Sequence, residues 1–218
     1  MDTEAQNYLS FLDVLHARDN RKFKKMGGTG ALAELLNTNA KTGLDGEDEV
    51  EDNERKFGRS LSFDLRKVIG TPLLAKVIRR GQFRVVSVDF IVPGDLCILE
   101  AGDEVMTDGV IVECADMTCD EMLVEGARIA RKSNDRGDVF VYAHTTVLQG
   151  WATVLAVGVG LNTLFELLNQ EFLERVRIEE EELAKASGSS HSPALGKHAH
   201  GASGILSQNG SSSSPQSK

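Results

Sequence analysis

The side chains that most often perform catalysis or bind metals are sparse in this 218-residue sequence, and their spacing matches no site type. The three cysteines, Cys97, Cys114 and Cys119, fit neither a zinc spacing nor a disulfide framework. Small thiols in a reducing compartment explain them simply. His144 lies between two predicted strands without a readable nucleophile beside it, so we interpret it as a surface or partly packed residue.

Three further histidines lie near the C-terminal end: His191, His198 and His200. A weak transition-metal site is one interpretation, but no cysteine or carboxylate accompanies them at a ligand spacing. We therefore expect a solvated tail and no metal site.

Phosphate binding would need a glycine-rich loop in the right setting. Residues 27–30 read Gly-Gly-Thr-Gly, but no strand pattern precedes them. The lysine that ends a Gly-x-x-x-x-Gly-Lys loop is also missing. The sequence therefore indicates no nucleotide site and no cofactor.

Glycine and carboxylate residues recur together at what read as turns. They are Gly94-Asp95, Gly102-Asp103, Asp108-Gly109, Asp120-Glu121 and Gly150. Glycine tolerates positive φ, and aspartate caps its own backbone, so both favour tight turns. We interpret these residues as architectural.

These turns separate short β-branched runs. The predicted strands are 83–88, 96–99, 110–112, 140–142, 145–147 and 152–157. Short strands joined by Gly/Asp turns, with no long helical pattern between them, predict a small β-barrel or double-sheet roll over residues 82–163. Parallel βαβ units are not expected.

Helical patterns flank the β region, which makes the expected fold class α+β. Residues 1–60 form a helical segment in which apolar residues recur at helical spacing from Tyr8 to Leu15. A break at the glycines precedes a second helix that begins at Ala31, and the acidic run 47–54 leads to a third short helix.

Three further segments complete the expected organisation. Residues 61–81 are a connector, in which Leu65, Val68, Leu74 and Val77 could line a helix interrupted at Pro72. An apolar stripe predicts a helix over 164–186, and Ser/Gly/His/Pro composition predicts disorder over 187–218.

Composition narrows the function classes. The formal net charge of −9 argues against a nucleic-acid partner, which would need a basic face. The longest apolar run, 151–161, is well short of the roughly 20 residues that span a bilayer. We therefore expect no membrane span in this chain.

The order of the turn motifs resembles the actuator domain of P-type ATPases. The matching elements are 88–96 (VDFIVPGDL), 102–109 (GDEVMTDG), Asp120-Glu121, Gln149-Gly150 and 156–158 leading to Asn162-Thr163. Met106 and Thr107 stand where the family prefers proline and alanine. The N-terminal pattern from Met26 to Gly58 resembles the cytoplasmic segment of plasma-membrane-type calcium pumps, which folds beside the actuator domain in that family.

The resemblance implies a catalytic loop that this chain has changed. In the family a Thr-Gly-Glu-Ser loop follows the Asp-Glu motif, and its glutamate positions the water that hydrolyses the phosphoenzyme. Aligned from Asp120-Glu121, those positions hold Glu125, Gly126, Ala127 and Arg128. Ala127 replaces the glutamate and has no group to take a proton. Glu125 is displaced by several Å, more than catalytic geometry tolerates, so we interpret Glu125 and Arg128 as solvated loop residues.

The family's Asp-Lys-Thr-Gly-Thr phosphorylation motif is absent from the sequence. We therefore expect a truncated, non-catalytic actuator-domain protein, not an enzyme, that regulates or docks on a full-length P-type calcium ATPase. The alternatives are a fragment or split part of a calcium-transporting pump, and a relic without a selected function. The expected location is the cytoplasm, with membrane association only through a pump partner.

Overall fold

The computed structural model describes residues 3–60, 73–126, 128–134 and 137–186. Two compact units are distinguished, Met1–Glu174 and Arg175–Lys218. The first holds the helical segment and the sheet, and the second contributes only the last part of one helix to the described residues. The predicted disordered tail 187–218 and its three histidines lie outside the described residues.

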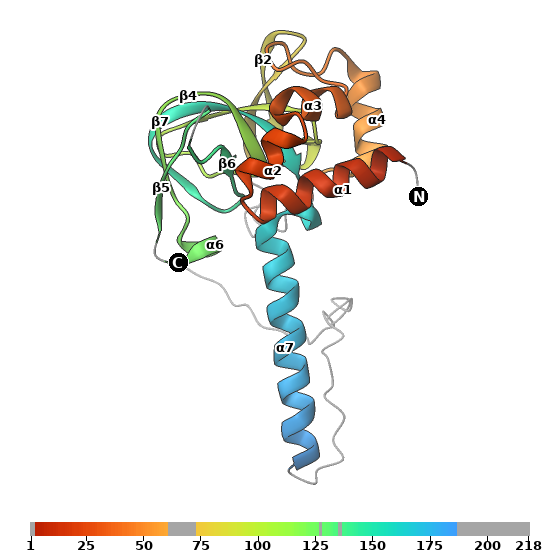
Figure 1. Ribbon diagram of the computed structural model, residues 1–218, viewed down its shortest axis with the longest axis vertical. Coiled ribbons are helices and arrows are strands. Elements are labelled where there is room, and N and C mark those ends of the chain that lie inside the picture. The colour runs from red at the N-terminus through yellow and green to blue at the C-terminus, as the bar shows by residue number, and fades with distance from the viewer. Residues whose placement is uncertain (1–2, 61–72, 127, 135–136, 187–218) are drawn as a thin grey trace, which may run out of the picture. The chain divides into compact units, whose positions relative to one another are not determined.

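The N-terminal segment is helical, as predicted (Figure 1). Its helices are α1 (Thr3–His16), α2 (Asn20–Lys25), α3 (Gly28–Leu35) and α4 (Glu47–Phe57). Two details differ from the sequence prediction. A separate short helix, α2, is capped by Asp19, whose carboxylate accepts from the Lys22 N–H at 2.9 Å. The acidic run does not merely lead to a helix but forms most of α4.

The β region forms one seven-stranded antiparallel sheet in the order β2-β1-β3-β7-β4-β5, with β6 also paired to β4. The strands are β1 (Leu74–Arg79), β2 (Gln82–Ser87), β3 (Leu96–Glu100), β4 (Asp108–Asp120), β5 (Ile129–Arg131), β6 (Phe140–Val141) and β7 (Thr146–Gly158). The α+β class is confirmed. Among the described residues the sheet does not close into a barrel, because β2 and β5 end the order without pairing to each other.

Strand β1 corrects the interpretation of the connector. Leu74 and Val77 were considered as part of an interrupted helix, but they lie in a strand between β2 and β3. Arg80 (φ 56°) and Gly81 (φ 65°) form a two-residue turn between β1 and β2. Two positive φ values in a two-residue hairpin turn match the twist of the flanking strands. The remainder of the predicted helix, up to residue 72, lies outside the described residues.

Strands β4 and β7 are 13 residues each, longer than any predicted strand. They pair along their length with register shifts, and Gly150 (φ 76°) lies within β7 instead of separating two strands. A Cβ atom on Gly150 would lie 2.3 Å from the Ala115 carbonyl oxygen, so this glycine allows a bulged β4 to approach β7.

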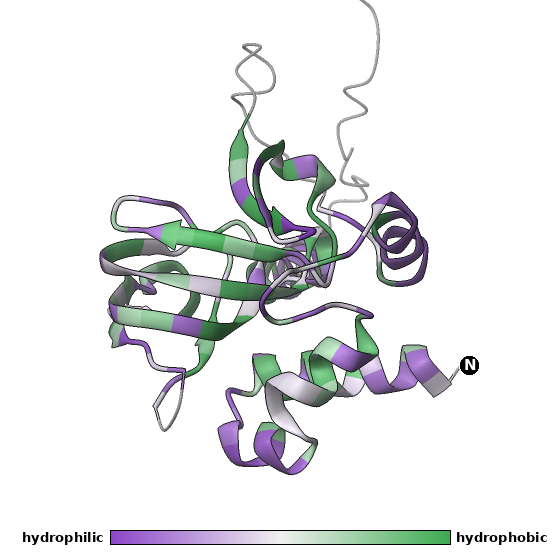
Figure 2. Ribbon diagram, turned by 90° about the horizontal axis from the view of Figure 1, so that it is seen from above, coloured by the Kyte–Doolittle hydropathy of each residue, from purple (hydrophilic) through white to green (hydrophobic). Residues whose placement is uncertain are grey.

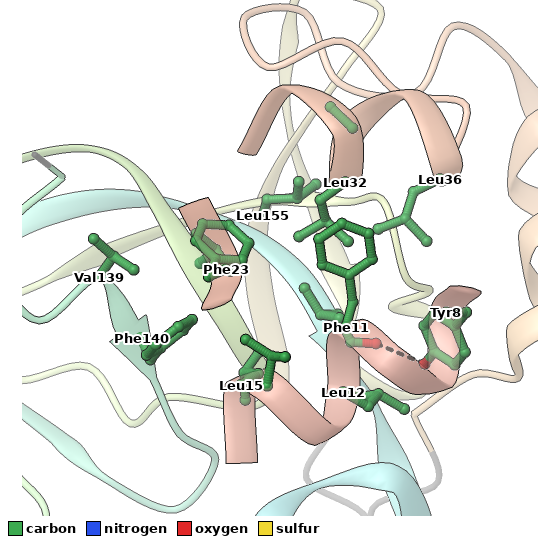
Figure 3. Close-up of a cluster of buried hydrophobic side chains, with 14 of the residues drawn as sticks. Tyr8, Phe11, Leu12, Leu15, Phe23, Leu32, Leu36, Val139, Phe140 and Leu155 are labelled. Carbon is green, nitrogen blue, oxygen red and sulfur yellow. Dashed lines mark hydrogen bonds between the residues drawn. The ribbon is translucent and has the colours of Figure 1, made fainter. Parts of the chain in front are cut away.

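Helices and sheet share one hydrophobic core. In Figure 2 the strands carry long hydrophobic stretches, whereas the helices of the N-terminal segment alternate between hydrophobic and hydrophilic residues. Figure 3 shows side chains of α1 gathered with Phe23, Leu32 and Leu36 and with Phe140 and Leu155 of the sheet. The Tyr8 hydroxyl donates to the Val157 carbonyl at 2.8 Å, and the Tyr142 hydroxyl donates to the Leu15 carbonyl at 2.9 Å. The helical segment is therefore packed on the sheet as part of the same fold.

Helix α7 (Leu164–Ala186) has the predicted bounds. Leu164 packs against the core cluster, but other members of its apolar stripe, such as Phe172 and Leu173, are exposed. No helix in the described part of the chain is both long and apolar enough to cross a bilayer.

Candidate functional site

The loop at the family's dephosphorylation position follows directly from the end of β4. It begins at Glu121, continues through the single helical turn α6 (Met122–Glu125) and leads into β5. The Val124 and Glu125 N–H groups both donate to the Glu121 carbonyl, at 3.0 and 2.9 Å. Gly126 has a φ of 76°, as a chain reversal after a helical turn favours. Ala127 lies outside the described residues.

Glu121 is fully buried and belongs to an ion-pair network. Its carboxylate contacts the Lys132 ammonium, which is also buried, and accepts from Arg18 Nη1 at 2.9 Å. Lys132 Nζ also lies 2.9 Å from Asp138 Oδ2. Burying a charge is costly unless it is paired and hydrogen-bonded, and each of these three carboxylate and ammonium groups has such a partner. The predicted turn residue Glu121 is therefore the buried centre of the loop.

Glu125 and Arg128 remain partly exposed, as solvated loop residues would be, but both also form ion pairs. Glu125 Oε1 lies 2.6 Å from Arg18 Nε, and Glu125 Oε2 lies 2.5 Å from Arg128 Nη1. The Glu125 side chain is 29% exposed. The hydrogen bond to Glu125 raises the pKa of Arg128, which stays cationic. Both oxygens of the only carboxylate among the four aligned loop positions are thus held by guanidinium groups.

The predicted turn at Gly94 and Asp95 is also an ion-pair site. Asp95 is fully buried, and its two oxygens accept from Arg79 Nε and Nη2 at 2.6 Å each. The Val92 N–H also donates to Asp95, at 3.0 Å. Gly94 has a φ of 101°, and a Cβ there would lie 2.8 Å from the Asn53 amide nitrogen of α4. The turn therefore supports the contact between sheet and helical segment.

Asp108 joins three parts of the fold. One oxygen accepts from the Ala143 N–H at 2.7 Å, and the other accepts from the Leu164 N–H at 2.5 Å, at the start of α7. His16 Nε2, at the end of α1, lies 3.1 Å from the same carboxylate. Gly109 serves a close approach, because a Cβ there would lie 2.5 Å from Val154 Cγ1.

The remaining predicted turn residues lie at the surface ends of strands. Gly102 has a φ of 95°. Asp103 accepts from the Glu100 N–H at 2.9 Å and pairs with Lys76 at 2.8 Å. Asp120 accepts from the Met122 N–H at 3.0 Å and so caps the start of α6. These contacts are consistent with an architectural role.

The cysteines and His144 form no reactive group. Burial raises the pKa of the Cys97 thiol, and burial raises that of Cys119 to about 12, so both thiols are protonated at neutral pH. His144 has a φ of 63° where the resemblance places a glycine, and its ring centroid lies 4.4 Å from that of Phe165. Within the described ranges, no three His, Cys, Asp or Glu side chains are grouped to hold a metal ion.

Sequence reasoning missed the cations that organise these sites. Arg18, Arg79 and Lys132 were not singled out, because a single arginine or lysine carries no local pattern. Arg18 lies 103 positions from its partner Glu121, so no spacing rule could have joined them. A carboxylate in a buried position, such as Glu121, needs a partner cation. That need is the one signal in the sequence that could have pointed to these cations.

The fold agrees with a comparison to known families. The family model of the P-type ATPase actuator domain matches residues 71–172, slightly less than half of the chain. The actuator-domain model matches this stretch, and the resemblance predicted from the turn motifs is confirmed there.

The similar curated proteins are calcium-transporting ATPases. Calcium-transporting ATPase 12, plasma membrane-type, of Arabidopsis thaliana is 25% identical over 127 residues, or 56% of this chain and 12% of that protein. Calcium-transporting ATPase 10, plasma membrane-type, of the same plant is 34% identical over 112 residues, 51% of this chain and 10% of that protein. Human plasma membrane calcium-transporting ATPase 3 is 34% identical over 88 residues, 40% of this chain and 7% of that protein. The chain thus spans about a tenth of the length of these relatives.

Proposed function

We propose that this chain is a non-catalytic actuator-domain protein that docks on a full-length P-type calcium pump and alters the turnover of its phosphoenzyme. The observation that carries the proposal is the pairing of Glu125 with both Arg18 and Arg128. A general base must have a free oxygen that can orient water and accept its proton. At the aligned glutamate position the chain has Ala127, and the neighbouring carboxylate is already held by two cations.

Surface charge supports a docking role. Helix α4 presents a run of acidic side chains, of which Glu47 is 76% exposed. Complementary charge on a partner would steer encounter and fix its orientation more than it would add affinity. The proposed location is the cytoplasmic side of a membrane, with attachment through the pump alone.

The test measures how the purified full chain acts on a pump of the plasma-membrane type. Human plasma membrane calcium-transporting ATPase 3 in vesicles would be phosphorylated with labelled ATP. The reaction would be run with and without the chain. We expect a saturable change in the decay rate of the phosphoenzyme and in calcium-dependent ATP hydrolysis. A charge-reversed α4 variant, with Glu47, Glu49 and Glu51 changed to Lys, should weaken the effect. Unchanged decay at chain concentrations well above that of the pump would contradict the proposal.

The second candidate function is a split part of a calcium-transporting pump. The packing of α1 on the sheet favours it, because the pieces of an actuator unit are assembled here. The decisive experiment co-expresses the chain with a pump that lacks its own actuator domain. Restored calcium uptake would support the split-pump role and exclude a purely regulatory one.

The third alternative, a relic without a selected role, makes a different prediction. A relic would have no effect in either assay although it folds. A cooperative thermal transition of the purified chain, combined with no effect on phosphoenzyme or uptake, would favour it.

A further inference from the structure

Arg18 occupies a strained corner between α1 and α2. Its φ is 53°, in the left-handed region that a non-glycine residue rarely adopts. The Arg18 N–H donates to the Leu15 carbonyl at 3.0 Å, and the Asp19 N–H donates to the Val14 carbonyl at 3.1 Å. Backbone strain of this kind persists only where the surroundings fix the residue, and it is concentrated at sites with a role.

The Arg18 guanidinium is fixed on three sides. Nε lies 2.6 Å from Glu125, and Nη1 lies 2.9 Å from Glu121. The Arg18 Cζ atom lies 4.1 Å from the centroid of the Tyr142 ring, which places the cation over an aromatic face. Tyr142 in turn donates to the Leu15 carbonyl of α1. A planar guanidinium can make these contacts together, whereas an ammonium cannot reproduce the fork.

The loop needs such an external contact. Helix α6 is four residues long, and a single helical turn is not stable by itself in water. Two of its residues, Met122 and Leu123, are more than half exposed and so bury little apolar surface. Val124 packs against the core cluster, and the ion pairs of Glu121 and Glu125 add polar contacts that hold the turn against the rest of the fold.

We propose that Arg18 is a positioning residue, which we call the Arg18 latch, that ties the turn between α1 and α2 to Glu121 and helix α6 and keeps this part of the loop in its present conformation. The latch depends on a residue that departs from the family motif, because the resemblance places an uncharged threonine at the position of Glu125. Arg128, at a position of serine, extends the same network to Asp138 at 3.2 Å. The inference rests on the proposed function and deepens it. While the latch is in place, the Glu125 carboxylate is paired with two arginines and is not available to orient water.

Hydrogen exchange of the purified full chain tests the latch. The reporters are the Val124 and Glu125 amides, which are hydrogen-bonded only within the turn. In Arg18→Ala we expect both to exchange about tenfold faster, in line with couplings measured for partly buried ion pairs. Glu125→Gln should act similarly, and the double variant should be no faster than either single one. Arg18→Lys should recover part of the protection.

Controls separate a latch from general loosening. Arg131→Ala is the matched variant, because Arg131 pairs with Asp116 in a pair that is more than 70% exposed on the neighbouring strand. It should leave the loop amides unchanged. The exchange rate of the Val154 amide of β7 should also stay constant in every variant. If Arg18→Ala unfolds the chain, the exchange rates in Glu125→Gln still test the latch.

Unchanged loop exchange in Glu125→Gln, or single effects that multiply in the double variant, would overturn the proposal. No pump is present in this measurement. The exchange measurement can therefore contradict the latch while the pump assay supports docking, and the reverse result is equally possible.

Discussion

Asp95 and Asp108 are fully buried carboxylates that hold the fold in different ways. Asp95 is paired with a nearly buried arginine, whereas Asp108 accepts two backbone N–H groups and contacts His16. Removing one member of a buried ion pair leaves an uncompensated charge, which costs more than the pair itself contributes. Single residues at these turns therefore control stability more than their exposed neighbours do.

We expect Asp95→Asn to lower the free energy of unfolding by about 3 to 5 kcal/mol, because Arg79 would remain buried beside a neutral amide. Urea unfolding followed by circular dichroism measures the change. Asp103→Asn is the control, since Asp103 pairs with Lys76 at the surface and should lose about 1 kcal/mol or less. Equal losses in the two variants would contradict this account of Asp95.

The sequence allowed the turn glycines to be found, but not their partners. Gly94, Gly102 and Gly150 have the positive φ that the Gly/Asp pattern predicts. Glu125, in contrast, was interpreted as a solvated loop residue, because its neighbours Val124 and Gly126 give no sign of an ion pair. Its ion pair is made with Arg18, in the turn between α1 and α2, and only the tertiary fold creates that contact.

The helices of the N-terminal segment carry much of the core. Tyr8, Phe11 and Leu15 of α1 are buried in the same cluster as Phe140 and Leu155 of the sheet. Each large apolar side chain contributes about 1.5–3 kcal/mol when it is fully buried. The two segments should therefore stay associated without a covalent link.

A protease site engineered between residues 61 and 72 tests this association. After cleavage we expect the N-terminal piece and the actuator domain to elute together on gel filtration. Phe11→Asp should separate them, because Phe11 is 6% exposed. Leu9→Asp, on the same helix but 45% exposed, should leave them together. Separation of the unsubstituted pieces would refute an integral role for these helices.

Helices and strands were predicted well where the spacing of apolar residues repeats over many residues. They were predicted poorly where the segment is short. Helix α7 has the predicted bounds because its apolar residues repeat over many turns. A helix was considered for the segment of β1 because its short sequence, Leu-Ala-Lys-Val-Ile-Arg, fits either period, and only pairing with β2 and β3 decides it. The length of β4 and β7 was missed because bulges interrupt the alternation that marks a strand.

The stability of the whole molecule should decrease at alkaline pH because of its buried thiol and phenol groups. Burial raises the pKa of Cys119 from 9.0 to about 12, and burial also raises the pKa values of Cys97, Tyr8 and Tyr142. Below pH 9 these groups are protonated in both the folded and the unfolded chain. Above pH 9 the unfolded chain loses protons that the folded chain retains, so the unfolded state is favoured.

We expect the free energy of unfolding to fall between pH 9 and pH 12, with each such cysteine contributing about 1.4 kcal/mol per pH unit. Urea unfolding at pH 8, 9, 10 and 11 measures the slope. Cys119→Ala should give a shallower slope, whatever its stability at pH 8. A slope identical to that of the unsubstituted chain would show that Cys119 titrates as an exposed thiol.

The contact between the Tyr8 hydroxyl and the Val157 carbonyl joins residues 149 positions apart. Helix α1 therefore leaves the ribosome long before β7, which it covers. At roughly 5–20 residues per second, translation of the intervening chain takes about 7 to 30 seconds. During that interval the apolar face of α1 has no completed sheet to pack against, so we expect nascent chains of this protein to expose that face to chaperones.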